Sequence, residues 1–251
     1  DPDSLSSRVQ GVTPSLTLAV TNQAKALRAQ GDEVYGLAGG EPEIDTPDHI
    51  KAAAIKALQD GKTKYTPAAG IPELREGIAK KLHEDNGLSY DPKQICVTSG
   101  GKQACMNAIM AMCDEGDEVI IPAPYWVSYP EMVRLCGAEP VIVETSEENG
   151  WKMTAEQFEE AMTPKTKMVI INSPGNPTGA VYGEKELIGL SKILLKYLKE
   201  DGIIVFDDYE DKWPEVIQAV NEFVKMYKLL SLIHISEPTR LRRIAYAGVG
   251  V

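Results

Sequence analysis

Hydrophobic positions recur with two different spacings along this chain. Before residue 90 the apolar side chains lie three or four positions apart, which predicts helices over residues 14–30, 46–59 and 70–86. After residue 90, short runs rich in β-branched residues alternate with further helical stretches. The runs predict strands at 94–98, 118–122, 140–144, 167–172 and 202–206, and the stretches between them predict helices at 102–113, 127–136, 154–162 and 184–200.

This alternation of strands and helices predicts the fold class. Near-continuous apolar strands that are joined by helices are typical of a mostly parallel sheet covered on both faces. We therefore expect an α/β three-layer sandwich. Ligands in such folds bind beyond the carboxyl ends of the strands, so the residues that follow each strand are the first candidates for a binding site.

Composition excludes several classes of partner. The net charge of −11 argues against a nucleic-acid-binding protein, which usually clusters Lys and Arg. No apolar run approaches the roughly 20 residues that a membrane-spanning helix needs, so we expect no membrane partner. The cysteines at 96, 105, 113 and 136 form no C-x-x-C pair. Free thiols are therefore expected, with no metal site and a cytoplasmic location.

Two of the predicted strand ends carry candidate binding residues: one has glycines and a lysine, and the other has a tryptophan. In TSGGKQ (98–103), Gly101 and Lys102 could hold an anion at a helix N-terminus, although a tight turn with a solvated lysine is the competing interpretation. The string is not a Walker A loop, because Cys96 and Gln103 stand where that motif needs Gly and Ser or Thr. In PAPYWVSYPEM (122–132), Trp126 could stack on a planar ring or simply pack in the core.

Two later strand ends place an amide and a carboxylate. NSPGNPTGAVY (172–182) predicts a rigid turn that could aim Asn176 at a ligand, although Asn-Pro is also common in ordinary turns. In VFDDYEDKW (205–213), a carboxylate could pair with a protonated ring nitrogen, or it could cap the next helix. Asp207 is the preferred candidate for that carboxylate and Asp208 is the alternative.

Five strings in this order resemble the class I/II, fold type I, pyridoxal-phosphate-dependent aminotransferases, and most of all their bacterial aspartate aminotransferase-like branch. They are GGEPEIDTP, GKTKYTPAAGIPELREGIA, VTSGGKQA, PAPYWVSYPEM and NSPGNPTGAVY, and the resemblance covers residues 5–209. It implies the pyridoxal-phosphate-dependent transferase fold, with an incomplete large domain. The implied division is an N-terminal arm with part of a small domain at 1–45 and a cofactor-binding large domain at 46–212.

The resemblance also assigns roles to individual residues. Gly101 and Lys102 match the loop that contacts the cofactor phosphate, Trp126 matches the aromatic residue stacked on the pyridine ring, and Asp207 matches the carboxylate on the ring nitrogen. Asn176 matches the residue that binds the ring hydroxyl oxygen.

Further matches concern the substrate and a second subunit. Gly40, together with Trp126 and Asn176, matches positions that contact the amino-acid substrate. Tyr65 matches a tyrosine that reaches the phosphate of a neighbouring subunit, which implies a homodimer. Tyr209 also matches a cofactor contact, but it stands one residue early relative to the family pattern, so its side chain could face away.

A larger departure concerns the lysine that forms a Schiff base with the cofactor. In the family it lies in a Ser-Lys segment well after the aspartate, and no such segment follows Asp207 here. Lys192 follows a serine but precedes Asp207, while Lys225 and Lys228 lie in a helical pattern without the family's flanking residues. No catalytic residue is therefore assigned, and we expect no appreciable transamination from this chain.

The end of the sequence resembles the translation of a DNA adapter. The string LSLIHISEPTR (230–240) is similar to the translation of a transposon-based sequencing-library adapter, and IAYA (244–247) is similar to its continuation. We expect residues 230–251 to be a non-native tail and residues 213–229 to be a helix of uncertain origin.

The expected function follows from the resemblance. It is amino-group transfer between an L-amino acid such as aspartate and a 2-oxo acid. Two alternatives stay open at this point: a related enzyme of the same fold, such as a carbon–sulfur lyase or a cyclase, and a non-catalytic α/β nucleotide-binding domain. Against the nucleotide-binding domain, no G-x-G-x-x-G follows the first predicted strand.

Overall fold

A computed structural model describes residues 4–37, 39–40, 44–197, 203–207 and 231–234 of the chain. Contacts divide the chain into two compact units, one that ends at Thr63 and one that begins at Lys64. The predicted domain division at residues 45 and 46 stays a prediction.

The first unit is helical. It contains α1 (Ser7–Gln10), α2 (Leu16–Ala29) and α3 (Asp48–Gln59). The α2 helix begins where the Ser15 hydroxyl accepts a hydrogen bond from the Leu18 amide at 3.3 Å, which satisfies a backbone group that the first turn leaves unpaired. The predicted helices at 14–30 and 46–59 are therefore confirmed to within two residues at each end.

The second unit is built on a parallel sheet of five strands in the order β2-β1-β3-β4-β5. All four neighbouring pairs run parallel, as predicted. The strands are β1 (Glu118–Ala123), β2 (Glu139–Glu144), β3 (Thr166–Asn172), β4 (Ile203–Asp207) and β5 (Ser231–His234).

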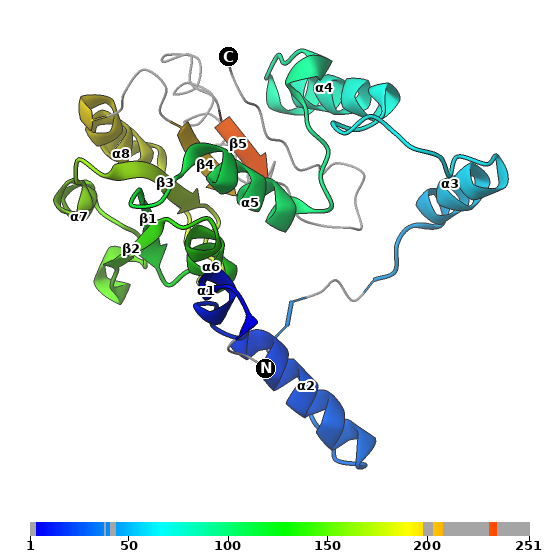
Figure 1. Ribbon diagram of the computed structural model, residues 1–251, viewed down its shortest axis with the longest axis horizontal. Coiled ribbons are helices and arrows are strands. Elements are labelled where there is room, and N and C mark those ends of the chain that lie inside the picture. The colour runs from blue at the N-terminus through cyan, green and yellow to red at the C-terminus, as the bar shows by residue number, and fades with distance from the viewer. Residues whose placement is uncertain (1–3, 38, 41–43, 198–202, 208–230, 235–251) are drawn as a thin grey trace. The chain divides into compact units, whose positions relative to one another are not determined.

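Helices cover both faces of this sheet, which confirms the predicted three-layer α/β sandwich (Figure 1). On β3, Val169 and Ile171 pack into one cluster with residues of α7 (Ala155–Ala161) and α8 (Glu184–Tyr197). Met168 and Ile170 pack into a second cluster with residues of α5 (Gly101–Met112) and α6 (Ser128–Leu135). This alternation follows from the two-residue period of a strand. The helices are α4 (Pro72–Asn86), η2 (Pro92–Gln94), α5 (Gly101–Met112), α6 (Ser128–Leu135), η3 (Glu147–Asn149), α7 (Ala155–Ala161) and α8 (Glu184–Tyr197).

The strand predicted at 94–98 is wrong. Pro92 opens the short helix η2, which Asp91 caps by accepting a hydrogen bond from the Lys93 amide at 2.8 Å. Ile95 is extended and buried, but it joins no strand ladder. The Val97 amide instead donates to the carbonyl of Ala69 at 3.0 Å. The segment resembles a strand in its sequence because it is buried and contains β-branched residues, but its hydrogen-bond partner is the loop that precedes α4.

The β5 strand lies inside residues 230–251, the predicted non-native tail. It pairs with β4 in parallel register, Asp207 opposite His234. This pairing does not test the origin of the segment, and that interpretation stays a prediction. The helix predicted at 213–229 lies outside the described residues. No helix in the described part of the chain is long and apolar enough to cross a membrane.

Candidate active site

The carboxyl ends of β1, β3 and β4 lie at one edge of the sheet. Asn172 and Asp207 end adjacent strands and are directly opposite each other in the ladder. This register follows from the parallel pairing of two apolar runs that both end in a polar residue. The edge therefore places an amide next to a carboxylate-bearing position, as expected for a binding site in a parallel sheet.

The N-terminus of α5 presents backbone amides and a cation. Gly100 stands at the N-cap with a φ of 84°, and no side chain caps the helix there. The loop before it is held by two hydrogen bonds, from the Thr98 hydroxyl to the Gly100 carbonyl at 2.9 Å and from the Ser99 amide to Gln103 Oε1 at 2.6 Å. Gly101 is buried in the first turn. Such a terminus favours an anion, since its free N–H groups can donate hydrogen bonds and the positive end of the helix dipole lies there.

Lys102 and Trp126 are brought together at this site. The Lys102 Nζ atom lies 4.8 Å from the centre of the Trp126 ring, within the range of a cation–π interaction. Trp126 also meets the ring of Tyr129 edge to face, with centroids 5.3 Å apart and an angle of 87°. The end of β1, from which the Trp126 loop begins, is joined to the residue after β2, because the Thr145 hydroxyl donates to the carbonyl of Ala123.

Asn176 lies exposed on the loop that joins β3 to α8. Its backbone amide donates a hydrogen bond to Asn172 Oδ1 at 2.7 Å, which folds the loop back over the end of β3. The turn leaves little space for a side chain at Gly175, because a Cβ atom there would lie 2.9 Å from the Thr178 hydroxyl oxygen. The peptide bonds before Pro174 and Pro177 are cis.

A small cavity lies between the loop after β1 and the loop after β3. Its volume is about 20 Å³, and Pro124, Tyr125, Asn172, Gly175 and Tyr182 contribute to its wall. That is room for about one water molecule. The cavity shows that the two loops face each other closely at the sheet edge.

The structure brings Asp207 to this edge beside Asn172, but it does not join Tyr65 to the group by a described contact. Tyr65 is fully exposed, with 108% relative accessibility. Gly40 belongs to the first unit, where it lines a groove of about 540 Å³ beside α2. Asp207 is described as the last residue of β4. Asp208 and Tyr209 lie outside the described residues.

Sequence reasoning missed Ser173 and Tyr182, which support the Asn176 loop. Both side chains are buried, and the Ser173 hydroxyl accepts a hydrogen bond from the Tyr182 amide at 3.1 Å. Burial raises the pKa of Tyr182 to about 12, because the apolar surroundings disfavour the phenolate. The only signal in the sequence was the position of both residues at the ends of the Pro- and Gly-rich string.

Comparison with known proteins identifies the family. The profile described as Aminotransferase class I and II matches residues 32–209. An aspartate/prephenate aminotransferase of Thermus thermophilus is 52% identical over 235 residues, covering 90% of this chain and 61% of the relative. An aspartate aminotransferase of Geobacillus stearothermophilus is 51% identical over 204 residues, covering 81% of this chain and 51% of the relative.

Solved structures of aspartate aminotransferases are also similar to this chain. The aspartate aminotransferase from Thermus thermophilus with maleate has a TM-score of 0.84 at 42% identity and covers 98% of this chain and 65% of its own. The enzyme from Rhizobium meliloti has a TM-score of 0.85 at 37% identity and covers 98% and 63%. The chain thus spans between 51% and 65% of the length of these relatives. Because the family match covers more than half of the sequence, the chain belongs to the class I and II aminotransferases.

Proposed function

We propose that this chain is part of a pyridoxal-phosphate-dependent aminotransferase that transfers an amino group between an L-amino acid such as aspartate and a 2-oxo acid. The family is dependent on this cofactor. The observation that carries the proposal is the contact of Lys102 with Trp126 beside the uncapped N-terminus of α5. It combines a phosphate-binding arrangement with an aromatic face.

The residues at the sheet edge fit the two ends of the cofactor. Lys102 and the first-turn amides of α5 suit a phosphate, because charge-assisted hydrogen bonds to its oxygens are strong. Trp126 offers a ring for stacking, and Asn176 offers an amide for a ring hydroxyl. Bound pyridoxal phosphate supplies an electron sink for a substrate carbanion. The role proposed for Asp207 is to hold the proton on the ring nitrogen.

We also propose that the chain, with the sequence printed here, binds the cofactor without linking it and does not catalyse the transfer. Lys192 lies exposed on α8, before β4 in the sequence, and Lys225 and Lys228 lie outside the described residues. This part of the proposal includes the adapter origin of residues 230–251, which sequencing of the source locus tests: an uninterrupted genomic frame that encodes the segment contradicts it.

The proposed partners follow the same reasoning. An amino acid and a 2-oxo acid are the substrates of the complete enzyme, with Gly40, Trp126 and Asn176 as substrate contacts. A homodimer in the cytoplasm is its proposed state, with Tyr65 reaching the phosphate of the second subunit. The full exposure of Tyr65 is what such a role requires.

A cofactor titration tests the proposal. Pyridoxal phosphate should bind the chain at least about tenfold more tightly than pyridoxal, because only the former has the phosphate that Lys102 recognises. NAD is the control ligand and should not compete. Borohydride treatment should leave no covalent adduct that saturates at a single lysine, and aspartate should give no turnover. Equal affinity for pyridoxal and pyridoxal phosphate contradicts the phosphate site, and turnover with aspartate contradicts the proposed inactivity.

A further inference from the structure

The loop between β3 and α8 (residues 173–183) is rigid within itself. The Gly175 amide donates to the Ala180 carbonyl at 2.7 Å, and the Gly179 amide donates to the Gly175 carbonyl at 2.6 Å. These bonds fix the shape of the turn that carries Asn176. They do not by themselves fix where the turn lies relative to the rest of the sheet edge.

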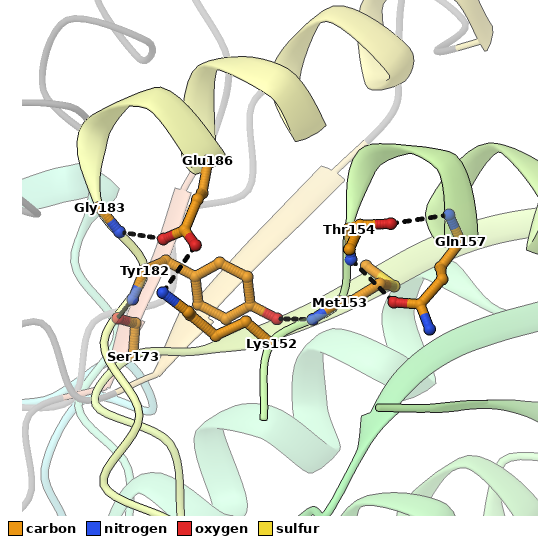
Figure 2. Close-up of polar contacts among 8 residues, drawn as sticks. All are labelled: Lys152, Met153, Thr154, Gln157, Ser173, Tyr182, Gly183 and Glu186. Carbon is orange, nitrogen blue, oxygen red and sulfur yellow. Dashed lines mark hydrogen bonds and ion pairs between the residues drawn. The ribbon is translucent and has the colours of Figure 1, made fainter. Parts of the chain in front are cut away.

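Tyr182 connects this loop to a different part of the fold. Its hydroxyl accepts a hydrogen bond at 2.8 Å from the amide of Met153, which lies 29 positions away in the sequence (Figure 2). Its own amide donates to the Ser173 hydroxyl at the other end of the loop. Tyr182 and Met153 are 3% and 2% exposed, so water does not compete for the hydroxyl bond.

The segment that supplies the Met153 amide is itself anchored to the sheet. Thr154 and Gln157 form a capping box at the start of α7. Gln157 Nε2 donates to the carbonyl of Glu144, the last residue of β2, at 2.9 Å. Lys152 adds an ion pair to Glu186 of α8 at 2.6 Å, shown in Figure 2. The Tyr182 hydroxyl therefore bonds to a point that is fixed relative to β2.

We propose that Tyr182 is a positioning residue that sets the place of Asn176 over the sheet edge. Two hydrogen bonds hold the far end of the loop: the Tyr182 hydroxyl accepts one from the Met153 amide, and the Tyr182 backbone amide donates the other to the Ser173 hydroxyl. Asn172 holds the near end, because its side chain accepts a hydrogen bond from the Asn176 backbone amide. This inference rests on the proposed function, because it is the ring hydroxyl of the cofactor that Asn176 is to contact. In this proposal Tyr182 acts through Asn176 and has no contact of its own with the cofactor.

The test uses the full chain with Tyr182→Phe, which keeps the buried ring and removes only the hydroxyl. The first readout is the pH midpoint at which the absorbance of bound pyridoxal phosphate changes as its ring hydroxyl ionises. Asn176→Ala should shift this midpoint, and Tyr182→Phe should reproduce at least half of that shift. The double variant should shift it no further than Asn176→Ala alone, since both changes act through one hydrogen bond.

The second readout needs no cofactor. Amide hydrogen exchange at Gly175 and Gly179 should become at least tenfold faster in Tyr182→Phe, since the loop loses an anchor. Thr163→Val is the control: it removes the hydroxyl hydrogen bond to Glu118, at the opposite end of β1, together with the one that the hydroxyl accepts from the Lys165 amide, and it should change neither readout. If Tyr182→Phe does not fold, Ser173→Ala removes the second bond and should shift both readouts in the same direction.

The outcomes separate the two proposals. Failure of the unsubstituted chain to bind pyridoxal phosphate overturns the proposed function and this role with it. Cofactor binding with an unchanged midpoint and unchanged exchange in Tyr182→Phe overturns the positioning role alone. A shifted midpoint with faster exchange at Gly175 and Gly179, neither of which occurs in Thr163→Val, supports it.

Discussion

The ammonium group of Lys102 lies 4.8 Å from the centre of the Trp126 ring, so a cation from the α5 terminus already contacts the aromatic residue that follows β1. The contact joins the first turn of α5 to the segment that follows β1, which are separate in the sequence. Both side chains are therefore within reach of one small molecule that carries an anion and a flat ring.

Replacing Lys102 by Met should weaken binding of pyridoxal phosphate by roughly 10- to 150-fold, the equivalent of a charged hydrogen bond of about 1.5–3 kcal/mol. It should also change the fluorescence of Trp126, because the cation leaves its ring. The affinity for pyridoxal should change much less. Lys80→Met on the exposed face of α4 is the control. An unchanged affinity for pyridoxal phosphate in Lys102→Met excludes Lys102 as a phosphate ligand.

The core cluster beside α7 and α8 should be sensitive to cavity formation. Phe158 is fully buried there, and Phe158→Ala should lower the free energy of unfolding by about 3–5 kcal/mol. Glu160→Ala on the exposed side of the same helix should stay within about 0.5 kcal/mol. Urea unfolding followed by circular dichroism measures both. Equal losses from the two substitutions contradict the assignment of Phe158 to the core.

Two glycines near α4 should respond in opposite directions to alanine. At Gly70 φ is +102°, and a Cβ atom would lie 2.6 Å from Val97 Cγ2, so Gly70→Ala should destabilise the fold by at least about 1–2 kcal/mol. Gly77 has open space around it inside the helix, so Gly77→Ala should stabilise it by about 0.5–1 kcal/mol. Melting temperatures that move in the same direction for both variants are incompatible with this local geometry.

Stability should fall at alkaline pH through Tyr182. Burial raises its pKa from the ordinary 10.0 to about 12. Because the folded state holds the phenol proton more tightly than the unfolded chain, this contribution is fully present below pH 10 and is lost as the pH rises toward 12. Tyr182→Phe should therefore lose less stability than the unsubstituted chain over that window. Urea titrations at several pH values measure the slopes, and identical slopes mean that Tyr182 does not titrate as described.

The strands β1 to β4 and the loops at the sheet edge could be predicted from the sequence because their signals are local, whereas β5 was not predicted. Each of β1, β2, β3 and β4 is an apolar run that ends at a turn or a polar residue, and the strings after β1 and β3 contain the prolines and glycines that shape the loops. The prediction of a strand around Ile95 is wrong, since apolar periodicity reports burial and not the hydrogen-bond partner.

The supports of the site could not be predicted in the same way. The bond between Tyr182 and Met153 joins residues whose proximity depends on how α7 and α8 pack on the sheet. Tyr182 is one more apolar position in the sequence, and nothing local marks its hydroxyl as a tether. The contact between Lys102 and Trp126 likewise requires the ends of α5 and β1 to meet.

The most direct test of the central claim is an NMR titration of the ¹⁵N-labelled chain with pyridoxal phosphate. We predict that the largest shift changes fall on the amides of Gly101, Lys102 and Asn176 and on the Trp126 indole, and that they saturate together at one affinity. Changes confined to surface lysines, or no saturable change at these four residues, contradict the claim that this edge of the sheet holds the cofactor.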